Sequence, residues 1–144
     1  MAVLSSETLH ATSVAIDGHA VLLEGASGVG KSDLALRLID RGGILISDDQ
    51  TLLVRQGDRL VARSPATIRG QIEVRGLGIV TMPHVEDVPV ALIVRLGVTP
   101  MRMPERRQRR IAGIVVREIA FDAFHASTPV KIEWALRQPE ATPA

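Results

Sequence analysis

The chain has no cysteine and very few aromatic residues, and both shortages exclude classes of function. Cys is absent from its 144 residues, aromatic residues make up 2% of them, and Tyr is missing. Without Cys there is no disulfide, no thiolate nucleophile and no thiolate-bound metal. Two Phe and one Trp offer little surface for stacking bases, and a formal net charge of +1 predicts no basic face. We therefore expect no nucleic-acid partner.

The sequence also lacks a segment that would send it into or across a membrane. The N-terminus, MAVLSSETLHATS, has no basic region followed by an apolar run, as a secretory signal requires. No apolar run approaches the roughly 20 residues that span a bilayer. We expect a cytoplasmic protein with no membrane partner. The length suits a single domain over residues 1–144, with an aliphatic core and a frayed tail at 139–144.

The hydrophobic pattern predicts mostly strands, with one helix after a glycine-rich loop and one near the C-terminus. A two-residue Asp17-Gly18 turn separates the first two strands. The expected strands are 9–16, 19–23, 44–47, a hairpin over 51–63, 88–96 and 111–121, and the expected helices are 31–41 and 127–137. Residues 72–82 mix strand and tight loop. This order predicts an α/β domain whose sheet is mixed and largely antiparallel, not a doubly wound sheet.

The glycine-rich loop matches the phosphate-binding (P-loop, Walker A) pattern G-x-x-x-x-G-K-[ST] in full. Its glycines let backbone N–H groups converge on phosphate oxygens, and the following helix adds its positive end. Lys31 is expected to reach the β- and γ-phosphates, and the Ser32 hydroxyl to hold Mg²⁺. We therefore predict binding of ATP or GTP with Mg²⁺. The nucleotide-binding residues are Gly25, Ala26, Ser27, Gly28, Val29, Gly30, Lys31 and Ser32.

Two adjacent aspartates, Asp48 and Asp49, follow the next expected strand. At a strand's end the chain can turn and bring both side chains toward one site. One carboxylate could then serve Mg²⁺ while the other accepts a proton from an attacking hydroxyl. The alternative is that the segment DDQT is only a polar turn, because Asp favours turns. The loop upstream favours the functional interpretation.

Three further features are weaker signals. Glu73 lies between Ile72 and Val74, so it is either on the solvent face of a strand or a ligand, and His10 lies on an expected strand. The segment MRMPERRQRR carries Arg102 and four more arginines, Arg106, Arg107, Arg109 and Arg110. Such a charge run is typical of a solvated loop, although it could also dock an acidic protein or contact phosphate.

These motifs together resemble a known family. LHATSVAIDGHAVLLEGASGVGKSDLALRLIDRGGILISDD (residues 9–49), followed by IEVRGLGI (72–79), resembles the catalytic C-terminal domain of HPr(Ser) kinase/phosphorylase. The family uses ATP and Mg²⁺ to phosphorylate a serine of HPr, the small phosphocarrier of the sugar phosphotransferase system, and also runs the reverse phosphorolysis. Its fold resembles that of phosphoenolpyruvate carboxykinase.

The resemblance also implies roles for individual residues. Asp49 becomes the proton acceptor, supported by Asp48, and Lys31 and His10 become active-site residues. By the same resemblance, Ser32 and Glu73 correspond to the Mg²⁺ ligands and Arg102 to the active-site arginine. Residues 72–80 correspond to a segment that is important to both reactions. The chain lacks the long members' N-terminal regulatory domain and a Pro-Arg-Pro-Gly-Arg-like segment that supports dephosphorylation. It thus resembles a short form, for which we expect kinase activity. Whether it also keeps the phosphorylase activity, as a bifunctional enzyme, and whether it forms a homo-oligomer as the long members do both stay open.

Two other functions remain open on the residues alone. The first is a P-loop kinase for a small molecule, with residues 83–110 as the only candidate lid. The second is a nucleotide-sensing module without catalysis, whose arginine run docks a partner.

Overall fold

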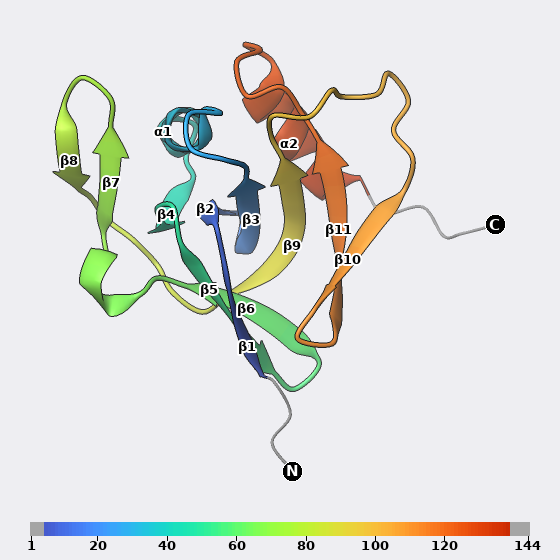
Figure 1. The fold of residues 1–144 in the computed structure, drawn as a ribbon. Coiled ribbons are helices and arrows are strands. Elements are labelled where there is room, and N and C mark those ends of the chain that lie inside the picture. Colours follow the sequence, from blue (N-terminus) through green and yellow to red (C-terminus); the bar gives the residue numbers. More distant parts are fainter. Residues whose placement is uncertain (1–4, 139–144) are drawn as a thin grey trace.

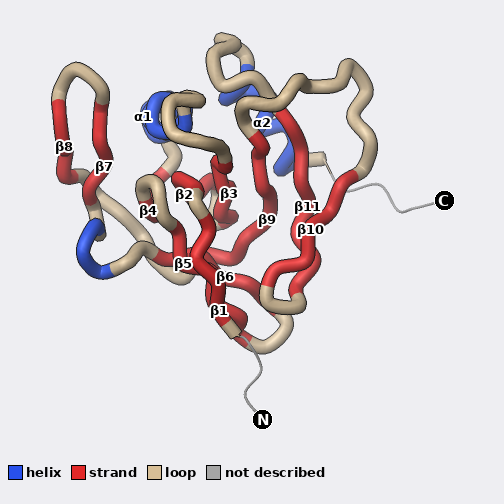
Figure 2. The backbone as a smooth tube through the Cα atoms, in the orientation of Figure 1, coloured by secondary structure: helices blue, strands red, loops and turns tan. Residues whose placement is uncertain are grey.

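The structure, a computed structural model, describes residues 5–138 and is built mainly of strands (Figures 1 and 2). The two helices are α1 (Lys31–Asp40) and α2 (Thr128–Arg137), with a 3-10 turn at Ala66–Ile68. The strands are β1 (Ser6–Leu9), β2 (Ala11–Ile16), β3 (His19–Glu24), β4 (Ile44–Ser47), β5 (Thr51–Gln56), β6 (Arg59–Arg63), β7 (Gln71–Val74), β8 (Gly78–Thr81), β9 (Val88–Arg95), β10 (Arg107–Ile111) and β11 (Ile114–Ala120).

The main sheet is mixed and largely antiparallel, as predicted. Its order is β1-β5-β6-β9-β3-β2-β4, with β11 and β10 joined to it through β9. Among the pairs of named strands in the described residues, only β9 with β3 and β9 with β11 are parallel. A separate hairpin, β7–β8, projects from one side of the molecule beside α1 (Figure 1).

Strand β9 joins two sub-sheets. Its first residues, Val88 and Pro89, pair with β6, while its last residues, Leu92 to Arg95, pair with β11. The other edge of β9 pairs with β3. Strand β9 therefore belongs to both sub-sheets and connects them. Because β3, β9 and β11 are parallel, their carboxyl ends lie at the same edge of the sheet.

The core has two layers because successive residues of β3 point to opposite faces of the sheet. Val21 and Leu23 pack with residues of α1 and α2, whereas Ala20 and Leu22 pack toward β5 and β6. All four of these side chains are fully buried. Both faces of the central strands are thus covered, which explains why all the residues of β2 are buried.

Several sequence predictions hold and several are wrong. The helices, the Asp17-Gly18 hairpin and the 51–63 hairpin are confirmed. The single strand predicted over 9–16 is wrong, because the chain bends at His10 when it leaves the β5 partner for the β3 and β4 partners. The strand predicted over 111–121 is also wrong at its start, because Ala112 and Gly113 adopt positive φ angles of 48° and 83° and form a hairpin turn.

The arginine run is not a solvated loop throughout. Arg107 to Arg110 belong to β10, which pairs with β11, and only the part before them is loop. The predicted frayed tail, 139–144, lies outside the described residues. Within the described part of the chain, neither helix has the length and apolar character that a membrane span needs.

Candidate functional site

The glycine-rich loop connects β3 to α1, as predicted. Gly30 caps the helix in the left-handed region, with φ 97°, and its carbonyl accepts the first helical hydrogen bond, from Leu34 N at 3.0 Å. Gly25 has no room for a side chain, because a Cβ there would lie 2.5 Å from Val29 Cγ2 and 3.2 Å from the Leu96 carbonyl oxygen. The loop therefore turns tightly at both glycines and aims the amino end of α1 into the site.

Lys31 is held inside this loop. Its side chain is 6% exposed, and its Nζ donates to the carbonyl oxygens of Gly25 at 2.6 Å and Ala26 at 3.2 Å. The same Nζ lies 3.8 Å from Asp49 Oδ1. A buried ammonium at a helix N-terminus makes this corner strongly electropositive.

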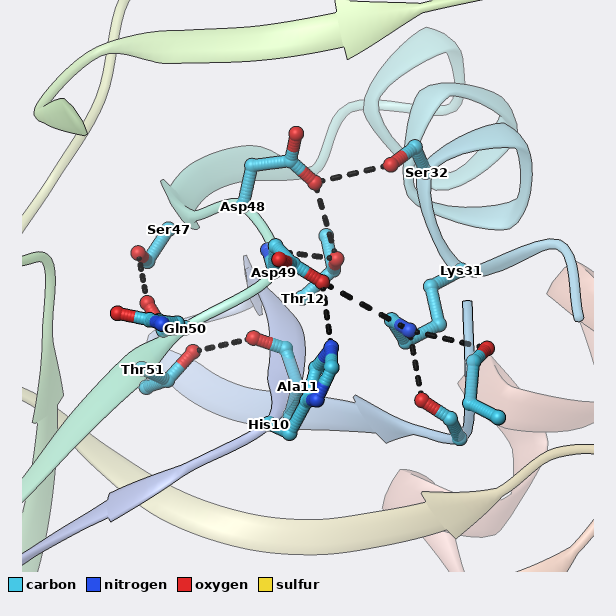
Figure 3. Close-up of polar contacts among 12 residues, drawn as sticks. His10, Ala11, Thr12, Lys31, Ser32, Ser47, Asp48, Asp49, Gln50 and Thr51 are labelled. Atoms are coloured by element: carbon cyan, nitrogen blue, oxygen red, sulfur yellow. Dashed lines mark hydrogen bonds and ion pairs between the residues drawn. The ribbon is translucent and has the colours of Figure 1, made fainter. Parts of the chain in front are cut away.

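Asp48 connects three segments that are far apart in sequence, and Figure 3 shows its contacts with Thr12 and Ser32. Its Oδ1 accepts from Thr12 Oγ1 at 3.0 Å and Ser32 Oγ at 2.9 Å, and its Oδ2 accepts from the Glu73 backbone N at 2.9 Å. The residue is 9% exposed. Hydrogen bonds to a buried carboxylate are among the stronger ones in proteins, so Asp48 fixes β2, α1 and β7 relative to one another.

Asp49 points to the same site as Asp48 because its backbone turns. Its φ is 65°, a left-handed value that Asp tolerates better than most residues. The backbone N of Asp49 donates to Thr12 Oγ1 at 3.1 Å, and its Oδ1 lies 2.7 Å from His10 Nε2. The Asp49 side chain is 59% exposed, unlike Asp48. One aspartate is thus buried, and the other presents an exposed carboxylate beside Lys31, as Figure 3 shows for the Asp49–Lys31 contact.

A cavity of about 260 Å³ opens beside the pair. It is lined by Asp48, Asp49, Gln50, Ile68, Gln71, Glu73 and Ile79. Glu73 is exposed, and its backbone rather than its carboxylate contacts Asp48. The cavity lies between the aspartates and the β7–β8 hairpin and leaves Asp49 open to a second molecule.

Arg102 is not brought into this cluster. It is exposed in the loop between β9 and β10, and within residues 5–138 it makes no hydrogen bond or ion pair. The arginine with the most contacts in the run is Arg109. Its guanidinium donates to both carboxylate oxygens of Glu24 at 2.6 Å and to Glu118 Oε2 at 2.7 Å. Those hydrogen bonds to Glu24 raise the pKa of Arg109 further above its ordinary value.

Sequence reasoning missed Thr12 and Arg109. Thr12 is fully buried, and its hydroxyl contacts both Asp48 and Asp49. The polar pair Thr12-Ser13 inside an otherwise apolar strand was the sequence signal that could have indicated it. Arg109 lies two residues before the buried Ile111, so the strand alternation places both on one face.

The oxygen donors of the site suit a magnesium ion that is held mainly by phosphates and waters. Ser32 Oγ and Asp48 Oδ1 lie 2.9 Å apart at the amino end of α1. Among the described residues, no group of three or more His, Cys, Asp or Glu side chains could hold a metal ion by itself. Mg²⁺ usually binds through one or two carboxylates together with substrate phosphates and water, so this sparse set fits it.

Known proteins resemble the chain in sequence and in fold. A protein named HPr kinase/phosphorylase from Mycoplasma genitalium is 45% identical over 76 residues, which is 53% of this chain and 24% of that protein. One of the same name from Lactiplantibacillus plantarum is 34% identical over 128 residues, 79% of this chain and 41% of that protein. The chain thus spans well under half the length of these curated relatives.

A solved structure described as the Hpr(Ser) kinase/phosphatase from Coxiella burnetii has a similar fold. The TM-score is 0.79 at 33% sequence identity, over 91% of this chain and 94% of that one. Residues 2–86, which include the glycine-rich loop, both aspartates and Glu73, match the model of the HPr Serine kinase C-terminal domain. The chain therefore belongs to the HPr Serine kinase C-terminal domain family.

Proposed function

We propose that the chain is an ATP- and Mg²⁺-dependent kinase that phosphorylates a serine of HPr. The observation that carries this proposal is the position of Asp49: a carboxylate exposed to a cavity, 3.8 Å from the buried ammonium of Lys31 at the amino end of α1. A proton acceptor and a phosphate-binding cation are the two groups that phosphoryl transfer to a hydroxyl requires side by side.

The glycine-rich loop would hold the triphosphate. Backbone N–H groups at residues 28–32 and the positive end of α1 favour bound anions. Lys31 would exchange its contacts with the Gly25 and Ala26 carbonyls for the β- and γ-phosphates. Bound magnesium would supply positive charge to the transferring phosphate, and Ser32 and Glu73 are the residues we propose to hold it. The Ser32 hydroxyl is placed for this by its 2.9 Å hydrogen bond to Asp48, and Glu73 lines the same cavity as Asp48.

Asp49 would accept the proton of the serine hydroxyl as its oxygen attacks the γ-phosphorus and the bond to ADP breaks. His10, 2.7 Å from Asp49 Oδ1, positions that carboxylate. Asp48 keeps Ser32 and the β7–β8 hairpin in place through its three hydrogen bonds. In the reverse direction the same Asp49 would donate the proton.

The test is to incubate the protein with HPr, ATP and Mg²⁺ and to follow the intact mass of HPr. We expect one added phosphate, located on serine. The Asp49→Asn variant should slow transfer by about 10²- to 10⁴-fold, the range of a general base, while keeping ATP affinity. Asn is a suitable substitute because it also tolerates a positive φ.

Asp58→Asn is the matched control, since Asp58 lies exposed in the β5–β6 turn and should leave the rate unchanged. If HPr gains no phosphate while ATP is consumed with a small metabolite, the chain is a small-molecule kinase instead. Tight ATP binding without transfer to any acceptor would favour a nucleotide sensor. Loss of ATP affinity in Asp49→Asn would mean that Asp49 has a different role.

A further inference from the structure

A second cavity, of about 520 Å³, lies on the other side of the glycine-rich loop. Three loops form it: residues 28–29 of the glycine-rich loop, residues 97–100 after β9, and residues 122–124 after β11. Its volume lies within the roughly 300–1,000 Å³ of small-molecule sites. None of the residues that line it belongs to the aspartate cavity.

The strand order explains why this cavity forms where it does. Strands β3, β9 and β11 are mutually parallel, so the loops that follow them leave the same edge of the sheet. Backbone hydrogen bonds continue past the strand ends, from Leu96 N to the Glu24 carbonyl at 2.8 Å and from Phe121 N to the Arg95 carbonyl at 3.2 Å. The carboxyl edge of parallel strands is where ligands of α/β proteins usually bind.

Close contacts keep the three loops together. A Cβ on Gly30 would lie 3.1 Å from the Phe124 ring, and one on Gly97 would lie 3.1 Å from Val29 Cγ1. The wall of the cavity is therefore continuous with the loop that we propose to hold the phosphates. A molecule anchored on the loop by its phosphates therefore has this cavity within reach of its next portion.

Phe124 gives the cavity an exposed aromatic face. Its side chain is 68% exposed in a chain with two Phe, one Trp and no Tyr. Its position is set by the Asp122 side chain, whose Oδ1 accepts a hydrogen bond from Phe124 N at 2.8 Å. The remaining lining is mostly apolar or glycine, with Asp122 and Thr99 as its polar side chains. An aromatic ring beside apolar walls is a platform on which a nucleobase stacks.

We infer that this cavity holds the base and ribose of the nucleotide, with the base stacked on Phe124. The inference rests on the proposed function, because it is the phosphates on the glycine-rich loop that bring the base to this wall. It assigns to residues 97–100 and 122–124, beyond the sequence motifs, a part in nucleotide binding. Stacking uses the face that every base has, so Phe124 itself does not select between adenine and guanine.

The experiment compares ATP with tripolyphosphate, which has phosphates and no base. Calorimetric titration with Mg²⁺ present and HPr absent gives the affinity of the wild type and of Phe124→Ala for each ligand. We expect Phe124→Ala to weaken ATP binding by roughly 5- to 150-fold, the range for one stacked base. Tripolyphosphate should bind equally to both proteins, because its phosphates do not contact the ring.

Two controls separate stacking from packing. Trp134→Ala removes another exposed aromatic, one on α2 that does not line the cavity, and should leave ATP affinity unchanged. Phe124→Leu keeps apolar volume against Gly30 but removes the aromatic face, and should lie between the wild type and Phe124→Ala. If Phe124→Ala does not fold, Phe124→Leu takes its place in the comparison of ATP with tripolyphosphate.

The possible results have distinct meanings. If Phe124→Ala loses as much affinity for tripolyphosphate as for ATP, Phe124 only supports the loop. If its affinity for ATP is unchanged, the base lies elsewhere. Either result overturns the inference. Wild-type protein that binds tripolyphosphate as tightly as ATP would also overturn it while leaving the phosphate site standing. Wild-type protein that binds neither ligand would reject the proposed function itself.

Discussion

Replacing Arg109 by Met should destabilise the protein by about 3 kcal/mol, because it leaves the partly buried Glu24 carboxylate without its cation and Glu118 with Arg95 alone. Arg109 makes three charge-assisted hydrogen bonds, two to Glu24 and one to Glu118. The three side chains are 29%, 23% and 9% exposed, respectively. Removing one partner of a buried pair costs about 3–5 kcal/mol, and we take the lower end because water reaches part of this cluster. Arg95, 3.6 Å from Glu118, compensates only one of the two acids.

The assay is urea unfolding followed by circular dichroism, with ATP affinity measured in parallel. Glu24 directly precedes Gly25, so its unbalanced charge should also repel bound phosphates and weaken ATP. Arg110→Met is the matched control, since Arg110 is the neighbouring residue and is exposed. Its effect should stay within about 0.5 kcal/mol, as for most surface substitutions.

A double substitution tests whether charge is the cause. Adding Glu24→Gln to Arg109→Met removes the unpaired acid, so the double variant should be more stable than Arg109→Met by about 1 kcal/mol or more, and its ATP affinity should recover. If the two substitutions simply add, or if Arg109→Met matches Arg110→Met in stability, the cluster does not hold this edge of the site and the reasoning fails.

Two further predictions concern the loop and the helices. Gly25→Ala should weaken ATP binding, measured by calorimetry, because its Cβ would lie 2.5 Å from Val29 Cγ2 and 3.2 Å from the Leu96 carbonyl oxygen, so that the Val29 side chain and the loop must shift; normal affinity would refute the steric argument. The hydrogen bond from Arg41 lowers the pKa of Glu133 from its ordinary 4.5, so the bridge stabilises the fold above pH 4.5 and is lost as the pH falls through the lowered value. Urea unfolding should therefore find Glu133→Gln less stable than the wild type near neutral pH and equal to it in strong acid, whereas a constant difference would contradict this.

Local features of the site were predictable from the sequence. The glycine-rich loop is a contiguous pattern whose conformation depends on its own glycines and on the helix that follows, and its place between β3 and α1 is as predicted. The convergence of two adjacent aspartates was also expected from a turn at the strand end. The structure adds the reason, which is the positive φ of Asp49.

Contacts between distant segments were not predictable in the same way. The bond from the Glu73 backbone to Asp48 joins residues 25 positions apart, and that between His10 and Asp49 joins residues 39 apart. No periodicity within either segment encodes such a pairing. The contacts of Arg109 could not be predicted for a different reason. The run contains five arginines, and only the pairing of β10 with β11 determines that Arg109 is the one that contacts Glu24.

Lys31 already has bonding partners, and this affects how tightly any anion can bind. Its ammonium satisfies the carbonyls of Gly25 and Ala26, which otherwise would repel an incoming phosphate and one another. The ammonium thus stabilises the conformation of the loop, and an arriving phosphate competes with the two carbonyls for it. The affinity for a phosphate therefore reflects the exchange of these two hydrogen bonds for new ones, and it is lower than the charge of Lys31 alone would give.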